Sequence, residues 1–235
     1  MMLESSLGLS GPSREIYLDN NATTQALPEV IEAVSQAMAH GWGNASSVHS
    51  AGERARKSLR KAREQVARML GTQANDVVFT SGATESNNLV LQSLLADNYQ
   101  DHRLITTSIE HSSVIEAAEH LRANGVEVVI LGVDADGLIS REEMLDAIEP
   151  GRTLVSIQWA SNETGVLQMI AELAELAHSA GARFHTDAVQ AVGKIPIDLS
   201  VAPIDFLSLS AHKVHGPLGV GALVGPGVHS INPLV

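Results

Sequence analysis

Residues 208–221 read Ser-Leu-Ser-Ala-His-Lys-Val-His-Gly-Pro-Leu-Gly-Val-Gly, and this stretch decides the fold. An apolar run ends in polar residues at 208–213, and a turn with three glycines leads at once into a second apolar run. The turn is too short for the crossover that parallel neighbouring strands require. The stretch therefore predicts that the last strand, 220–224, is antiparallel to its neighbour.

Upstream of this stretch, short apolar runs alternate with segments of helical period, which is typical of crossover units on a parallel sheet. We expect an α/β fold of three layers, in which helices cover both faces of a mainly parallel sheet. The seven expected strands are 77–80, 103–107, 127–131, 153–158, 183–187, 204–209 and 220–224. The expected helices are 28–39, 51–70, 84–97, 112–124, 140–147 and 170–180. The apolar spacing within 28–39 predicts one buried stripe.

The composition excludes several classes of function. The chain has 235 residues, which favours one large domain, and its net charge of −12 argues against binding to a phosphate backbone. Because these residues include no cysteine, they hold no disulfide, no thiolate metal ligand and no thiol nucleophile. No apolar run approaches the roughly 20 residues of a membrane helix. Residues 1–14 do not read as a secretory signal, so we expect a loose tail and a cytoplasmic protein.

In an open α/β sheet, ligands bind outside the carboxyl ends of the strands. Residues 81–88, Ser-Gly-Ala-Thr-Glu-Ser-Asn-Asn, follow the first strand and start a helix. Small residues at a helix start expose backbone N–H groups that cradle phosphate, although a simple Ser or Thr cap is the commoner explanation. The spacing matches neither a Walker loop nor a dinucleotide fingerprint.

Four other strand ends carry polar residues. Asp187 is either the cap of a following helix or a functional carboxylate, and a metal site with His185 lacks a recognisable third ligand. Lys213 is either a solvated loop lysine or a desolvated nucleophile, and His111 is by itself typical of a cap. Together with the polar run 161–165, these residues meet at one edge of the sheet, and this joint placement favours a functional site.

These motifs, in this order, resemble the pyridoxal-phosphate enzymes of the class V aminotransferase group, and most closely the cysteine desulfurases of the NifS/IscS type. The matching stretches are 17–24, 43–49, 79–88, 110–111, 162–165, 185–190 and 210–213. The resemblance implies the large domain of the fold type I transferases over residues 15–235, without the C-terminal small domain.

The resemblance also implies roles for individual residues. Lys213 would bind pyridoxal 5′-phosphate covalently through its amine, and Asp187 would pair with the pyridine nitrogen. His111 would stack on the ring and move protons, while Asn162 and Gln190 would hydrogen-bond the phenolic oxygen. The residues implied for the phosphate are Ala83, Thr84, Ser210 and His212. Lys213 and His111 are the implied catalytic residues, and no metal is implied.

The implied activity is release of sulfur from L-cysteine to give L-alanine, for the synthesis of iron-sulfur clusters or thio-cofactors. Family members continue into a substrate-binding arginine and a loop cysteine that these residues do not contain. We therefore expect either that these residues are a fragment of a longer protein or that the gene is split and a second chain supplies the remainder. We also expect exposed apolar surface, and a homodimer or a complementary C-terminal polypeptide, with a sulfur acceptor such as an iron-sulfur scaffold. Two alternatives are a selenocysteine lyase or other class V enzyme, and a non-catalytic scaffold subunit that retains the fold.

Overall fold

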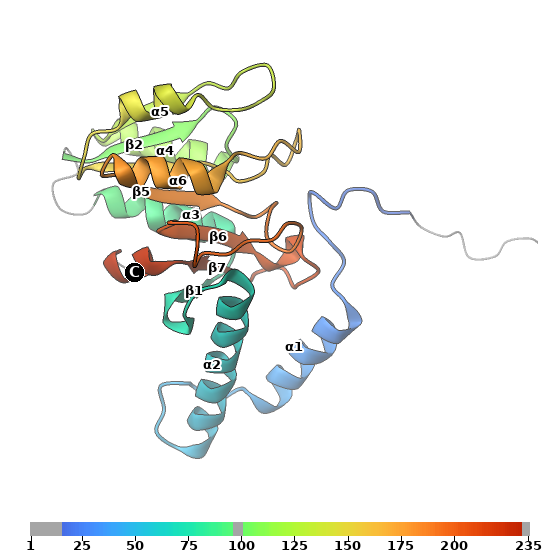
Figure 1. The fold of residues 1–235 in the computed structure, drawn as a ribbon. Helices are drawn as coiled ribbons and strands as arrows, with labels where there is room; N and C mark the ends of the chain where they lie inside the picture. The colour runs from blue at the N-terminus through green and yellow to red at the C-terminus, as the bar shows by residue number, and fades with distance from the viewer. Residues whose placement is uncertain (1–15, 96–100, 232–235) are drawn as a thin grey trace, which may run out of the picture.

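A seven-stranded sheet forms the centre of the protein (Figure 1). The computed structural model describes residues 16–95 and 101–231. The strands are β1 (Val77–Thr80), β2 (Arg103–Thr107), β3 (Glu127–Leu131), β4 (Thr153–Ser156), β5 (Arg183–Asp187), β6 (Phe206–Ser210) and β7 (Gly221–Val224). Each expected strand is present, and the largest differences are two residues, at the end of β4 and the start of β6.

The strand order is β1-β7-β6-β5-β4-β2-β3. β7 pairs antiparallel with both β6 and β1, whereas the other neighbours pair parallel. The prediction from the glycine turn is therefore confirmed. Because β7 runs against the others, its first residue, Gly221, lies between the last residues of its neighbours, Thr80 and Ser210.

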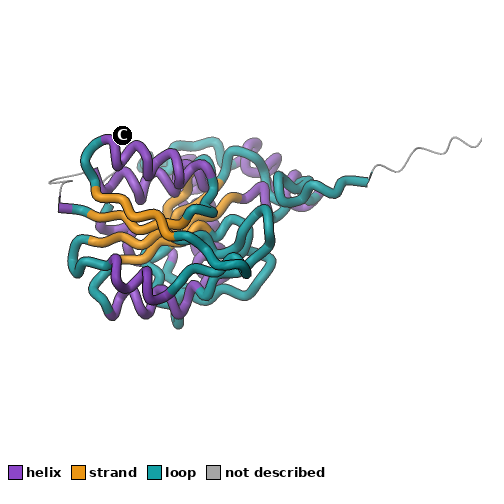
Figure 2. Tube along the Cα trace, turned by 90° about the horizontal axis from the view of Figure 1, so that it is seen from above, coloured by secondary structure: helices purple, strands orange, loops and turns teal. Residues whose placement is uncertain are grey.

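Helices cover both faces of the sheet, as the view from above in Figure 2 shows. The helices are α1 (Pro28–His40), α2 (Ser50–Leu70), α3 (Ala83–Gln92), α4 (Ser112–Ala123), α5 (Arg141–Ala147) and α6 (Ile170–Ser179). Short 3-10 helices are η1 (Ala74–Asp76), η2 (Ser93–Leu95), η4 (Ala211–Lys213) and η5 (Pro226–Ser230). Side chains of α3 and α4 pack on one face, and those of α5, α6 and the end of α2 pack on the other. The expected three layers are confirmed.

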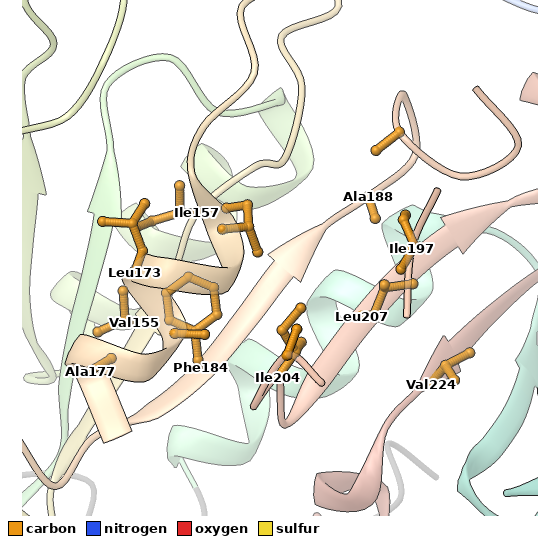
Figure 3. Close-up of a cluster of buried hydrophobic side chains, with 14 of the residues drawn as sticks. Val155, Ile157, Leu173, Ala177, Phe184, Ala188, Ile197, Ile204, Leu207 and Val224 are labelled. Atoms are coloured by element: carbon orange, nitrogen blue, oxygen red, sulfur yellow. The ribbon is translucent and has the colours of Figure 1, made fainter. Parts of the chain in front are cut away.

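The inner strands β2, β4, β5, β6 and β7 are buried on both faces, so their successive side chains enter different cores. Leu154 of β4 packs with α3 and α4, whereas the next residue, Val155, packs with α6. Figure 3 shows the cluster that contains Val155, in which Phe184 of β5 lies beside Leu173 and Ala177 of α6. Burial on both faces suits the apolar run of β7, whereas the edge strands β1 and β3 are mostly half-buried.

Two helix expectations need correction. The helix expected over 84–97 ends at Gln92 and is followed by η2, while residues 96–97 lie outside the described part, as does the expected tail 1–14. The helix over 28–39 is present as α1, but its expected burial is wrong: no α1 residue is buried, and Ile31 and Met38 are 60% and 75% exposed. Periodicity identifies an apolar face, but burial also requires a surface to cover it.

The carboxyl ends of the parallel strands open on one side, and the chain preceding α1 crosses that side (Figure 1). This N-terminal segment, residues 16–27, binds the loop after β6. The backbone N–H of Thr24 donates to the carbonyl of His212 (2.8 Å), and that of Leu27 donates to the carbonyl of His215 (3.2 Å). Among the described residues, no helix is long and apolar enough to cross a membrane.

Glu110 joins the ends of β2 and β4 beneath this side of the sheet. Its Oε1 accepts hydrogen bonds from Thr107 Oγ1 (2.7 Å) and from the backbone N–H of Gln158 (2.9 Å). Its Oε2 is buried and has no partner among the described residues. Burial is the main cause that raises the pKa of Glu110 to about 8, and the charge of Asp187 adds to it. The next residue, His111, caps α4, so Glu110 fixes the start of that helix.

We predict that Gly221→Ala destabilises the protein by about 1–3 kcal/mol, the usual cost of overpacking. A Cβ at Gly221 would lie 2.6 Å from Gly82 Cα and 2.7 Å from the carbonyl oxygen of Leu209, and neither backbone atom can turn aside. This clash outweighs the roughly 0.4–1 kcal/mol that Gly→Ala gains through the unfolded chain. Gly132→Ala is the control, because its Cβ would meet no atom within 4 Å. Equal urea midpoints for the two variants would contradict the packing argument.

We also predict that Glu110→Gln changes the free energy of unfolding, relative to wild type, more favourably at pH 8.5 than at pH 5.5. The folded state raises the pKa of Glu110 from 4.5 to about 8, so it binds a proton that the unfolded chain releases within this interval. Wild-type stability therefore falls as the pH rises from about 4.5 to about 8, and glutamine removes that loss. Unfolding in urea at both pH values measures the effect, with the exposed Glu116→Gln as control. A stability difference that does not change with pH would refute it.

Candidate active site

A cavity of about 660 Å³ lies at the carboxyl ends of the strands. The structure brings all of the site residues expected from the sequence to its wall: Ala83, Thr84, His111, Asn162, Asp187, Gln190, Ser210, His212 and Lys213. They come from β5, β6, the starts of α3 and α4 and the loops between these elements. The volume is within the range of about 300–1,000 Å³ that is usual for cofactor and ligand sites.

The Asp187 carboxylate lies at the buried end of the cavity and is 7% exposed. Its Oδ2 accepts a hydrogen bond from Asn87 Nδ2 (2.8 Å), and its Oδ1 accepts one from the backbone N–H of Val189 (3.0 Å). Residues 189–193 form turns, so the alternative that Asp187 caps a helix is wrong. Burial raises the pKa of Asp187, and the donated hydrogen bonds oppose this rise. The described residues offer it no ion pair within 4 Å.

The start of α3 presents free backbone donors. Gly82 is the cap residue and makes no side-chain cap bond, so a Ser or Thr cap does not explain this sequence. The first-turn glutamate, Glu85, accepts from the backbone N–H of Ser81 (2.7 Å) instead. The N–H groups of Ala83 and Thr84 have no intrahelical partner and donate to no described residue. With the helix dipole, they form an anion site beside the hydroxyl of Ser210.

The Lys213 amine is held by the N-terminal segment. Its Nζ donates to the carbonyl oxygen of Asn21 at 2.5 Å. Burial is the main cause that lowers the pKa of Lys213, and the nearby charge of Lys194 lowers it further, against the opposing charges of Asp187 and Asp19. The structure therefore favours the desolvated amine over the solvated loop lysine.

His212 precedes this lysine. Its Nδ1 lies 3.0 Å from Thr23 Oγ1, and its pKa is lowered first by burial and then by the charge of Lys213. Thr23 belongs to the same N-terminal segment that holds Lys213. The segment therefore orients two successive residues of the loop after β6.

His111 is both a cap and a cavity residue. Its Nδ1 accepts a hydrogen bond from the backbone N–H of Ser113 at 3.1 Å at the start of α4. A neutral ring in this arrangement carries its proton on Nε2. His111 therefore caps α4 and also lines the cavity.

The two amide residues expected near a phenolic oxygen meet through Asn21. Gln190 Nε2 donates to the Asn21 carbonyl oxygen (2.9 Å), and Asn21 Nδ2 donates to the carbonyl of Asn162 (3.1 Å). Both Asn162 and Gln190 line the cavity. Asn21 thus connects the loops that follow β4 and β5.

Sequence reasoning missed several residues that hold the site. Asn87 is buried and donates to Ser113 Oγ (3.0 Å) as well as to Asp187, which ties α3 to α4 and β5. It lies four residues after Ala83, so helical spacing already put it on the face that starts at the cavity. Asn21 and Gln158 also line the cavity, but Asn21 belongs to an irregular segment without a periodic signal.

A metal site with His185 is not supported by the geometry. Its Nδ1 lies 2.8 Å from Ser156 Oγ and its Nε2 lies 3.0 Å from Ser208 Oγ, so both ring nitrogens are already used. Burial lowers the pKa of His185 to about 3, which keeps the ring neutral. Within residues 16–95 and 101–231, no group of three or more potential ligands is arranged for a metal ion.

These residues fit pyridoxal phosphate. An anionic phosphate matches the donors at the start of α3, and a protonated ring nitrogen matches a buried carboxylate that forms no ion pair with any described residue. The Lys213 amine lies on the wall of the same cavity and can react with an aldehyde. The cavity thus offers one complementary group for each charged or reactive part of that molecule.

Comparison with known proteins agrees with this geometry. The family model described as aminotransferase class-V matches residues 16–233. A cysteine desulfurase of Cereibacter sphaeroides is 47% identical over 210 residues, which are 88% of this chain and 54% of that protein. One of Bradyrhizobium diazoefficiens is 46% identical over 209 residues, or 88% of this chain and 53% of the relative. The chain thus spans about half the length of these curated relatives.

Solved structures give the same result. The structure titled "SspA in complex with cysteine" superposes with a TM-score of 0.89 at 37% identity, covering 93% of this chain and 64% of the other. A NifS-like protein superposes with a TM-score of 0.90 at 36% identity, covering 94% and 62%. The fold is that of the fold type I transferases. The chain therefore belongs to the class-V aminotransferase family, whose cysteine desulfurases use pyridoxal phosphate.

Proposed function

We propose that residues 15–235 form the cofactor-binding large domain of a pyridoxal-phosphate-dependent cysteine desulfurase, which takes sulfur from L-cysteine and leaves L-alanine. One observation carries the proposal: the Lys213 amine, the Asp187 carboxylate and the start of α3 all line one cavity. The identity to cysteine desulfurases and the likeness to a protein solved with cysteine support the choice of substrate.

Each residue has a role that its contacts support. Backbone N–H groups of Ala83 and Thr84, with Ser210 and His212, bind the phosphate. Asp187, held in place by Asn87, accepts a hydrogen bond from the ring nitrogen and keeps it protonated. When bound, pyridoxal phosphate supplies the electron sink that carbon–sulfur cleavage requires.

Four further side chains act around the ring. The lowered pKa of Lys213 increases the fraction of neutral amine, which is the form that reacts with an aldehyde. His111 stacks on the ring and moves protons at Nε2, since its Nδ1 is occupied by the α4 backbone. Asn162 and Gln190 donate to the phenolic oxygen. We propose no metal in this reaction.

The sulfur that is taken from L-cysteine needs a thiol acceptor. The balanced reaction is L-cysteine plus a thiol giving L-alanine plus a persulfide, and the 235 residues contain no cysteine to supply that thiol. We propose that the thiol lies outside these 235 residues, and that a sulfur-acceptor protein such as an iron-sulfur scaffold receives the sulfur afterwards. The proposal includes a cytoplasmic location.

Exposed apolar side chains on and around α1 support association with a second polypeptide, either another copy of this chain or a complementary one. These residues are Leu18, Leu27, Ile31, Val34, Met38 and Trp42. Scattered exposed apolar residues need no explanation, but a series along one otherwise unburied helix favours an interaction surface.

We predict that borohydride reduction of the chain with pyridoxal phosphate attaches the cofactor to the peptide that contains Lys213. Peptide mass spectrometry locates the adduct, and visible absorbance reports its formation. Lys213→Ala should lose both signals, because no other lysine lies on the cavity wall. Lys61→Ala, a change of an exposed α2 lysine, should keep them. An adduct that persists in Lys213→Ala would end the assignment of this lysine.

We further predict that the 235-residue chain forms alanine from L-cysteine no faster than free pyridoxal phosphate does. The rate should rise when a polypeptide carrying the acceptor cysteine is added, because that thiol completes the reaction. Alanine and sulfide are measured together, with Lys213→Ala plus the same polypeptide as control. Sulfur release by the 235 residues alone, above the rate of the free cofactor, would contradict the proposed need for a thiol outside them.

A further inference from the structure

Lys194 lies outside the cavity wall but is joined to it through Gln190. Its Nζ contacts Gln190 Oε1 at 2.5 Å in the turns after β5. A lysine ammonium only donates hydrogen bonds, so it selects the oxygen of the amide and turns the nitrogen away from itself. The contact therefore orients the Gln190 amide so that its oxygen faces Lys194 and its nitrogen faces away from Lys194.

The nitrogen end of Gln190 points toward the site. Gln190 Nε2 donates to the Asn21 carbonyl oxygen at 2.9 Å, and the same oxygen accepts from Lys213 Nζ. An amide nitrogen carries two protons, so one N–H of Gln190 remains for a ligand in the cavity that it lines. Lys194, Gln190, Asn21 and Lys213 thus form one hydrogen-bonded series.

The backbone that carries Lys194 is tightly packed. Its N–H donates to the carbonyl of Ala191 at 3.0 Å, and Ala191 is 1% exposed. The preceding residue, Gly193, has a φ of +75°, and a Cβ there would lie 2.8 Å from Val214 Cγ1 in the loop after Lys213. The amine therefore extends from a fixed turn next to the Lys213 loop.

We propose that Lys194 is a positioning residue that holds the Gln190 amide with its remaining N–H toward the cavity, where it donates to an anionic phenolic oxygen. The inference rests on the proposed function, because that oxygen belongs to pyridoxal phosphate. Without Lys194 only the Asn21 carbonyl oxygen still opposes a flip of the amide, and a flipped amide presents its own oxygen to the anion, which is repulsive. The charge of Lys194 also acts on Lys213. Burial is the main cause that lowers the pKa of Lys213, the charge of Lys194 lowers it further, and the charges of Asp187 and Asp19 raise it.

The first test uses the cofactor-free chain. Lys194→Met removes the ammonium but keeps an unbranched side chain, whereas Lys194→Arg keeps both charge and donors. We expect the ¹⁵N side-chain amide signals of Gln190, assigned by their loss in Gln190→Ala, to shift in Lys194→Met and to stay close to wild type in Lys194→Arg. The control is Lys61→Met on α2. Unchanged Gln190 signals in Lys194→Met would overturn the proposal, whether or not the chain binds the cofactor.

The second test measures binding of pyridoxal phosphate in a double-mutant cycle. Lys194→Met should weaken binding about tenfold, because a hydrogen bond to a charged group is lost. In a Gln190→Ala background the same change should cost less than twofold, since the amide to be positioned is gone. Equal losses in both backgrounds would show that Lys194 acts by charge or by structure alone. Failure of the wild-type chain to bind the cofactor would refute the proposed function, and the amide signals would still decide the role of Lys194.

Discussion

Because β1 to β6 all run in one direction, their carboxyl ends, and the polar residues that follow them, gather at one edge of the sheet. β7 is the exception. It is inserted between β1 and β6, so that its first residue, not its last, reaches this edge. A side chain there would collide with the loop that starts α3, and glycine alone lets the two backbones approach. The reversed strand thus places the anion site of α3 beside Ser210 and, three residues on, Lys213.

Burial of polar groups under the cavity is the second constraint. Glu110, His185 and Asp187 are all at least nine-tenths buried, and each has a pKa displaced toward its neutral form mainly by burial. Hydrogen bonds from backbone, hydroxyl and amide groups offset part of the desolvation at these residues. Such a floor is rigid, because moving any one group would leave another buried atom without a partner.

Much of the fold was predictable, because the spacing of apolar residues indicates buried strands and amphipathic helices. The hairpin from β6 to β7 was predictable for a steric reason, the length of its turn. The burial of α1 was not, since periodicity does not say whether a covering surface exists. Asp187 was ambiguous because a carboxylate after a strand suits a cap and a site equally. Asn21 and Lys194 carried no signal of their own, because their contacts depend on how irregular segments fold back: Asn21 and Lys213 are 192 residues apart.

Charges of both signs line the cavity. The net charge of the chain is −12, and the wall carries Asp19 and Glu85 as well as Lys213 and the positive end of α3. The negative charge of Asp187 is set apart, at the buried end, where it is shielded from water and held by Asn87. A ligand with an anionic group at one end and a cationic nitrogen at the other is therefore oriented by the cavity itself. Overall charge argues only against binding to extended polyanions, while the separation of charge within the cavity determines which small molecule fits and which way round it binds.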